Sequence, residues 1–174
     1  MAAVMEAGAS VVWVPAYVGL GSNLDNPVAQ VMRAMQEMRG IAGVHFVAGS
    51  HFYKNPPMGP QDQPDYVNAV AGLLTRKSPE DLLGLLQGLE EQLGRVRVAG
   101  DRWGPRVIDL DLLVYGHQEK SVPGLNLPHP GISERNFVLL PLCSIAPALH
   151  VPGQGNVFEL AGRVDATTLH RINA

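Results

Sequence analysis

The chain has 174 residues, of which 46% are hydrophobic and 17% charged, and its formal net charge at pH 7 is −3. These values are typical of one folded domain, residues 1–174, and argue against a disordered chain or a general nucleic-acid surface. A lone cysteine, Cys143, excludes an internal disulfide and favours a reducing cytoplasm, and the apolar run 11–20 is too short to span a bilayer. We expect a cytoplasmic protein with residues 1–12 as a flexible extension.

The first expected elements are a strand and a helix. Residues 11–21 are rich in β-branched and aromatic side chains, and they predict a strand that ends at Gly19 and Gly21. Asn26 then caps a helix that begins at Pro27. The apolar stripe of this helix has helical spacing and consists of Val28, Val31, Met32, Met35 and Met38.

Two more strands and a second helix follow. Residues 44–53 and 65–75 predict strands, separated by a loop rich in proline and glycine. Ser78 caps the second helix and Pro79 begins it. Its apolar face consists of Leu82, Leu85, Leu86, Leu89 and Leu93. After a further loop, residues 107–115 predict a fourth strand.

The order strand, helix, strand, strand, helix, strand is that of the ferredoxin-like βαββαβ sandwich. The predicted class is therefore α+β, with an antiparallel sheet that carries both helices on one face. A shorter helix at residues 133–140, loops and a tail form C-terminal additions.

The stretch RWGPRVIDLDLLVYG, residues 102–116, places two aspartates inside an apolar strand. Alternate side chains of a strand share a face, so Asp109 and Asp111 point the same way, with Cα atoms about 7 Å apart, away from the two helices. Magnesium binds through such carboxylates together with phosphate oxygens, and two ions fit between a carboxylate pair and a polyphosphate. Alone, an Asp-x-Asp motif is more often a pair of ordinary solvated acids.

The loop before this strand strengthens the phosphate interpretation. It contains four of the ten arginines of the chain and no lysine: Arg95, Arg97, Arg102 and Arg106. Arginine suits bidentate recognition of phosphate oxygens. The alternative is pairing with surface acids, yet only Asp101 lies nearby in sequence. A cationic loop beside paired carboxylates favours phosphoryl chemistry on a nucleoside triphosphate.

The remaining candidates are aromatic and polar residues near loops. Three aromatic residues lie in or beside polar segments, although each taken singly is more often a core residue: Tyr66, Trp103 and Phe137. Asn68 shares a strand face with Tyr66 and offers an amide to a flat heterocycle. His129 is compatible with either a phosphate contact or a loop cap. The six histidines lack zinc-ligand spacing.

Four ordered blocks resemble one known family: YVGLGSN, NPPMGPQDQPDYVNAV, GRVR…RWGPRVIDLDLLVYG and LPHPGISERNFVLLPL. They are similar to the 6-hydroxymethyl-7,8-dihydropterin pyrophosphokinases of folate biosynthesis over residues 17–147. The resemblance implies a ferredoxin-like monomer that transfers pyrophosphate from ATP to the hydroxymethyl group of the pterin and releases AMP.

The resemblance also implies roles for individual residues. Asp109 and Asp111 would hold two Mg²⁺ ions with ATP. The catalytic arginines would be Arg95, Arg97 and Arg106. Contacts to ATP would come from Gln87, Glu90, Arg95, Arg97, Arg106, His129 and Arg135. The pterin would contact Pro56, Pro57, Met58, Tyr66, Asn68, Trp103 and Phe137.

Three residues depart from the pattern of some family members: Val98, Gly100 and Pro130, which alter the surroundings of the phosphates. Two other functions stay open. One is a two-metal nucleotide enzyme of the polymerase-palm or cyclase type, and the other is a ferredoxin-like module that binds a ligand without turnover.

Overall fold

The computed structural model describes residues 12–96 and 104–173. The described part contains a six-stranded sheet in the order β10-β3-β4-β1-β5, with β2 also paired to β4, and two small hairpins. In chain order the elements are β1 (Val14–Ser22), α1 (Pro27–Met38), β2 (Val44–Gly49), β3 (Phe52–Asn55), β4 (Tyr66–Thr75), α2 (Pro79–Gln92), β5 (Asp109–Tyr115), β6 (Lys120–Val122), β7 (Leu125–Leu127), α3 (Asn136–Ile145), β8 (His150–Val151), β9 (Gly155–Asn156), α4 (Val157–Ala161) and β10 (His170–Ile172).

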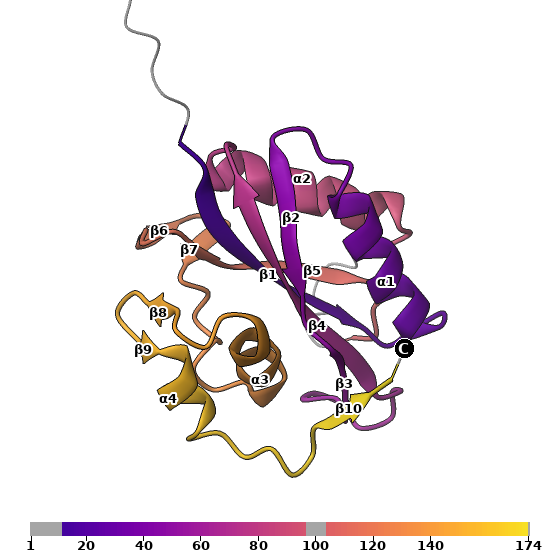
Figure 1. Ribbon diagram of the computed structural model, residues 1–174. Helices are drawn as coiled ribbons and strands as arrows, with labels where there is room; N and C mark the ends of the chain where they lie inside the picture. The colour runs from indigo at the N-terminus through magenta and orange to yellow at the C-terminus, as the bar shows by residue number, and fades with distance from the viewer. Residues whose placement is uncertain (1–11, 97–103, 174) are drawn as a thin grey trace, which may run out of the picture.

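The predicted α+β, ferredoxin-like architecture is confirmed. All strand pairs of the main sheet are antiparallel. One apolar core, which includes Leu110 and Leu112, lies between the sheet and helices α1 and α2. A second core packs α3 and α4 against the other face, as their separate positions in Figure 1 indicate. The C-terminal additions therefore cover part of the face that the two ferredoxin-like helices leave open.

The first strand does not end at its glycines, so that prediction is wrong. Gly19 and Gly21 lie inside β1, which pairs with β4 on one side and with β5 on the other. Backbone hydrogen bonds to two neighbouring strands hold this segment extended and need no side chain. Gly19 lies opposite Asp111 and Gly21 lies opposite Asp109.

The second predicted strand, residues 44–53, is divided into β2 and β3. Ser50 lies at the break, where its N–H donates to the Val70 carbonyl at 2.8 Å and its hydroxyl accepts from the Val70 N–H at 2.9 Å. A side chain thus replaces part of the main-chain ladder. The chain keeps its direction past Ser50, and β3 pairs with the other half of β4.

The helix predicted at residues 133–140 is shifted in the structure to α3, Asn136–Ile145. Its start is delayed because a turn precedes it, in which the Ile132 N–H donates to the His129 carbonyl at 3.2 Å. The helix continues through Pro141 because Leu139 and Leu142 are fully buried in the second core. Burial of these side chains outweighs the missing proline N–H.

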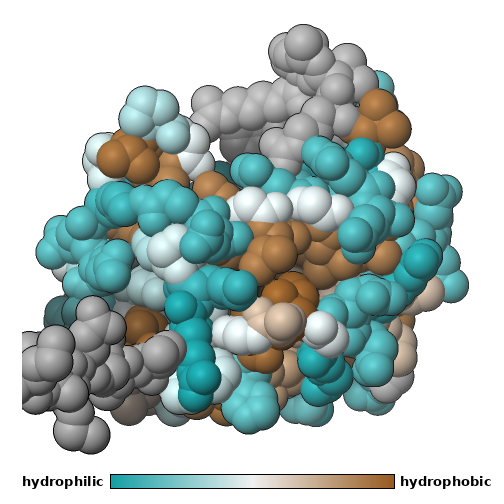
Figure 2. Space-filling view, turned by 90° about the horizontal axis from the view of Figure 1, so that it is seen from above, coloured by the Kyte–Doolittle hydropathy of each residue, from teal (hydrophilic) through white to brown (hydrophobic). Residues whose placement is uncertain are grey.

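The tail contributes to the main sheet. After α4 the chain runs along the lower side of the molecule to β10, which pairs with β3 at the sheet edge (Figure 1). The face seen from above is mostly hydrophilic, with hydrophobic residues near its middle (Figure 2). Within the described ranges, no helix combines the length and the apolar character that crossing a membrane requires.

Candidate functional site

A cavity of about 500 Å³ opens where β1, β4 and β5 meet the end of α2 and the loop before α3. Asp109 and Asp111 lie side by side in its lining, as predicted, because Leu110 and Leu112 turn the opposite way into the core under the helices. The cross-strand neighbours of the two aspartates are glycines. The cavity therefore combines two carboxylates with bare main chain.

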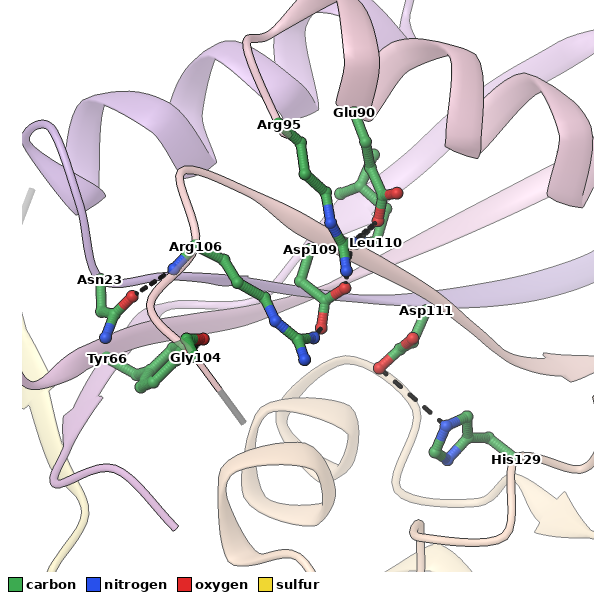
Figure 3. A network of polar contacts seen from close by, with 10 residues as sticks. All are labelled: Asn23, Tyr66, Glu90, Arg95, Gly104, Arg106, Asp109, Leu110, Asp111 and His129. Atoms are coloured by element: carbon green, nitrogen blue, oxygen red, sulfur yellow. Dashed lines mark hydrogen bonds and ion pairs between the residues drawn. The ribbon is translucent and has the colours of Figure 1, made fainter. Parts of the chain in front are cut away.

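Asp109 lies between two guanidinium groups (Figure 3). Arg95 forms an ion pair with its Oδ1, and Arg106 Nη1 lies 2.6 Å from its Oδ2. Arg95 and Arg106 therefore pair with Asp109, an acid of the strand that follows them, and not with a surface acid.

Glu90 positions the Arg95 guanidinium through an ion pair. Its side chain is 1% exposed and lies on the inner face of α2. Its Oε1 accepts from the Leu110 N–H at 2.7 Å and pairs with the Arg95 guanidinium. A buried carboxylate needs such partners, so Glu90 ties the end of α2 to β5 and fixes one arginine at the cavity.

Asp111 has a different environment from Asp109. Its recessed position in the cavity and the nearby Asp109 carboxylate raise its pKa to about 7, although the Arg135 guanidinium opposes this shift. His129 Nε2 lies 4.0 Å from its Oδ2 (Figure 3). Burial, together with Arg135, lowers the pKa of His129. Among the described residues, the cationic side chains that pair closely with Asp109 make no such ion pair with Asp111.

The orientation of His129 follows from the turn that holds it. The Gly131 N–H donates to His129 Nδ1 at 3.1 Å, and the His129 N–H donates to the Leu113 carbonyl at 2.8 Å. A neutral imidazole that accepts at Nδ1 carries its proton at Nε2. That N–H is directed toward the cavity and is available to an anionic oxygen.

One end of the cavity has an aromatic and amide lining. The Tyr66 hydroxyl donates to the Gly104 carbonyl at 3.1 Å, and Phe137 enters from the first turn of α3. Asn68 Nδ2 donates to Asn55 Oδ1 at 2.6 Å, with both side chains buried. This end of the cavity matches a flat ligand with a polar edge.

Sequence reasoning missed Asn23, which is 2% exposed. Its side chain connects the loop after β3 to the loop before β5. Its Oδ1 accepts from the Arg106 N–H at 2.7 Å, and its Nδ2 donates to Gln63 Oε1 at 3.0 Å and the Pro64 carbonyl at 3.1 Å. Asn23 is the last residue of the YVGLGSN block. Its place in that block was the available signal.

The cavity brings together most of the predicted residues: Met58, Tyr66, Asn68, Gln87, Glu90, Arg95, Arg106, Asp109, Asp111, His129, Arg135 and Phe137. Pro56 and Pro57 line an adjoining cavity, together with Met58 and Phe137. Arg97 and Trp103 lie outside the described residues. Within those residues, no group of three or more His, Cys, Asp and Glu side chains is arranged to hold a metal by itself.

Comparison with known proteins identifies the family. The model of the family described as 7,8-dihydro-6-hydroxymethylpterin-pyrophosphokinase (HPPK) matches residues 17–147. The chain is 46% identical over 160 residues to the 2-amino-4-hydroxy-6-hydroxymethyldihydropteridine pyrophosphokinase of Haemophilus influenzae, covering 92% of this chain and 99% of that protein. It is also 42% identical over 139 residues to the folic acid synthesis protein fol1 of Pneumocystis carinii, covering 80% of this chain and 18% of that protein.

A solved structure shares the fold. The crystal structure of Plasmodium falciparum HPPK-DHPS with pterin and p-hydroxybenzoate has a TM-score of 0.70 at 11% identity, over 94% of this chain and 47% of that chain. The fold and the sequence matches define a pyrophosphokinase of folate biosynthesis. The chain belongs to the 7,8-dihydro-6-hydroxymethylpterin-pyrophosphokinase family.

Proposed function

We propose that this protein transfers pyrophosphate from ATP to the hydroxymethyl group of 6-hydroxymethyl-7,8-dihydropterin and releases AMP, with Mg²⁺ as the cofactor. The observation that carries the proposal is the convergence of two strand aspartates and two guanidinium groups in one cavity of a pyrophosphokinase-family chain. Such a site matches a polyphosphate that is bound together with divalent cations.

Asp109 and Asp111 fit a role as magnesium ligands because both carboxylates face the same cavity from one strand. Two carboxylates do not complete an octahedral shell, so the remaining ligands would be phosphate oxygens and water. Two bound Mg²⁺ ions would neutralise the triphosphate and increase the electrophilic character of its β-phosphorus.

The arginines would exchange partners when ATP binds. In the structure, Arg95 and Arg106 pair with Asp109. A triphosphate would offer these arginines oxygens to pair with, and the Asp109 carboxylate would then help to hold magnesium. Arg97 by resemblance, and His129 and Arg135 from the facing loop, would complete the phosphate contacts. Gln87 and Glu90, on α2, would lie near the nucleotide.

The pterin would lie between Tyr66 and Phe137, with its polar edge toward Asn68. The buried Asn68–Asn55 amide pair supports this placement, because it holds a donor–acceptor group rigidly at the end of the cavity. Pro56, Pro57 and Met58 would border the same edge, and Trp103 would close over the ring by resemblance.

The chemical step would be one displacement. The pterin hydroxyl oxygen forms a bond to the β-phosphorus while the bond between that phosphorus and the AMP oxygen breaks, and the hydroxyl proton passes to water. Fixed guanidinium groups stabilise the charge that spreads over the phosphoryl oxygens. The protein therefore contributes mainly position and charge neutralisation.

Product analysis tests the proposal. Incubation with ATP, Mg²⁺ and 6-hydroxymethyl-7,8-dihydropterin should yield AMP and the pterin diphosphate in equal amounts. Release of pyrophosphate would indicate a palm-type or cyclase-type enzyme instead, and ligand binding without any turnover would indicate a binding module. Either result would overturn the proposed reaction.

A further inference from the structure

The C-terminal strap, residues 163–172, connects α4 to the edge of the main sheet, where β10 lies beside β3 (Figure 1). At its far end, β10 pairs with β3, with Arg171 opposite Tyr53 and His170 opposite Lys54. Strand β3 ends at Asn55, whose amide bonds to Asn68. The far end of the strap therefore holds the strand that leads into the Pro56–Met58 segment.

The near end of the strap is attached to α3. Asn136 Nδ2 donates to the Asp165 carbonyl at 2.6 Å. Asn136 lies between Arg135 and Phe137, in the first turn of a helix that has no side-chain cap of its own. Asp165 is fixed in turn, because its carboxylate accepts from the Thr167 N–H and hydroxyl, both at 2.9 Å. The bond from Asn136 thus fixes the turn that presents Phe137.

A second cavity, of about 550 Å³, lies between these attachments. Its lining comes from three segments: residues 55–58 after β3, residues 133–137 at the start of α3, and strap residues Arg163, Val164, Asp165 and Thr168. The strap is bonded to the start of α3 through Asn136, and its residues 170–172 pair with residues 52–54 of β3, directly before the 55–58 wall.

From this arrangement we infer that the strap sets the separation of the two walls of the pterin pocket, and that Asn136 is a positioning residue for Phe137. The inference rests on the proposed placement of the pterin. Releasing the strap should let the walls move apart, whereas Asp109 and Arg106 at the phosphate end belong to other elements. Pterin affinity should therefore fall more than nucleotide affinity, to which this wall contributes only Arg135.

Calorimetry with Asn136→Ala tests the inference. Titration of 6-hydroxymethyl-7,8-dihydropterin, in the presence of Mg²⁺ and a non-hydrolysable ATP analogue, should give a Kd about three- to tenfold above that of the unmodified protein, as expected for one lost hydrogen bond. The Kd of the ATP analogue should rise by a smaller factor than the Kd of the pterin, because only Arg135 of this wall is proposed to contact the phosphates. A matched control is Asn156→Ala, which removes the cap of α4 but touches neither wall.

A second variant releases the other end of the strap. Deletion of residues 170–174 removes β10, whose His170 and Arg171 are exposed, and should also weaken pterin binding. Because freeing either end frees the strap, the combined variant should lose less affinity than the product of the two separate losses.

Three results would overturn the inference: unchanged pterin affinity in Asn136→Ala, an equal loss in Asn156→Ala, or strictly multiplicative losses in the combined variant. The proposed function fails separately, because in that case the unmodified protein itself would not bind the pterin. If the deletion variant does not fold, the comparison of the two asparagine variants still decides the question.

Discussion

Asp109 and Asp111 are separated by one residue, yet they have opposite electrostatic surroundings. Asp109 pairs with two arginines, whereas Asp111 is recessed beside Asp109 and has a pKa of about 7. The strand alternation that puts both side chains on one face also creates their mutual repulsion. The neighbouring Asp109 carboxylate therefore contributes to the raised pKa of Asp111.

The pH dependence of stability should reveal this difference. The folded-state pKa of Asp111, about 7, lies above its ordinary value of 3.8, so ionisation of Asp111 opposes folding. The protonated carboxyl group makes its full contribution to the free energy of unfolding below about pH 4, and this contribution is lost as the pH rises to about 7. Asp111→Asn should therefore be more stable than the unmodified protein at pH 8 in EDTA, with the advantage shrinking toward pH 4. Urea unfolding measures this, and an advantage independent of pH would contradict it.

Phe137 tests the aromatic end of the cavity. Phe137→Ala should weaken pterin binding roughly tenfold or more through lost stacking, but it should also destabilise the fold, because Phe137 packs against the second core. Phe137→Leu is the matched control for packing: it keeps an apolar side chain and loses the ring. Calorimetry should show weak pterin binding in both variants, and normal affinity in Phe137→Leu would remove the ring from the pocket.

At the scale of elements, the hydrophobic pattern predicted where helices occur better than which residues they bury. Both ferredoxin-like helices begin at the predicted prolines, Pro27 and Pro79, with the predicted caps. Met32 and Leu85 belong to the predicted stripes, yet they are 51% and 38% exposed. They lie at the margins of their apolar faces, and helical periodicity alone does not predict whether a residue at such a margin contacts the sheet.

The misplaced boundaries have a common physical reason. The glycines inside β1, the break at Ser50 and the passage of α3 through Pro141 all depend on neighbours distant in sequence. Similarly, the Asp109–Asp111 pair was predictable from strand alternation, but its pairing with Arg95 was not. That contact depends on where α2 ends relative to β5, which local pattern does not encode.

Glu90 connects α2 to β5, and its replacement should lower the stability of the fold. Glu90→Ala leaves the Leu110 N–H and the Arg95 guanidinium without this buried acceptor, so the free energy of unfolding should fall by about 2–4 kcal/mol. Glu90→Gln keeps an acceptor and should lose less. Urea denaturation measures both, with the neighbouring exposed Glu91→Ala as the control. A loss in Glu90→Ala no larger than in Glu91→Ala would show that the junction contributes little.

For the whole molecule, the cavity joins segments from both halves of the chain, from Gly19 to Val138. Asn23 connects the end of β1 to both surrounding loops. A ligand that fills this cavity therefore contacts β1, β4, β5, α2 and α3 together. Binding should stabilise the folded state as a unit, since the unfolded chain has no such site.

Magnesium should need the nucleotide for this stabilisation. Asp109 is occupied by arginines, and two carboxylates alone provide few ligands. Millimolar Mg²⁺ alone should leave the Tm unchanged, whereas Mg²⁺ with a non-hydrolysable ATP analogue should raise it by several degrees. Asp109→Asn should reduce the part of the shift that depends on magnesium. A clear Tm increase with Mg²⁺ alone would contradict the proposed partner exchange.

The glycines of β1 have a consequence for inhibitors. Gly19 and Gly21 expose main-chain atoms to the cavity, and a Cβ at Gly21 would lie 2.8 Å from Asn68 Oδ1. A compound that rests on this bare backbone has no side chain there for a resistance mutation to remove. Adding a side chain at Gly21 would displace the very amide that the natural substrate is proposed to use, so escape at this position would carry its own penalty in fitness.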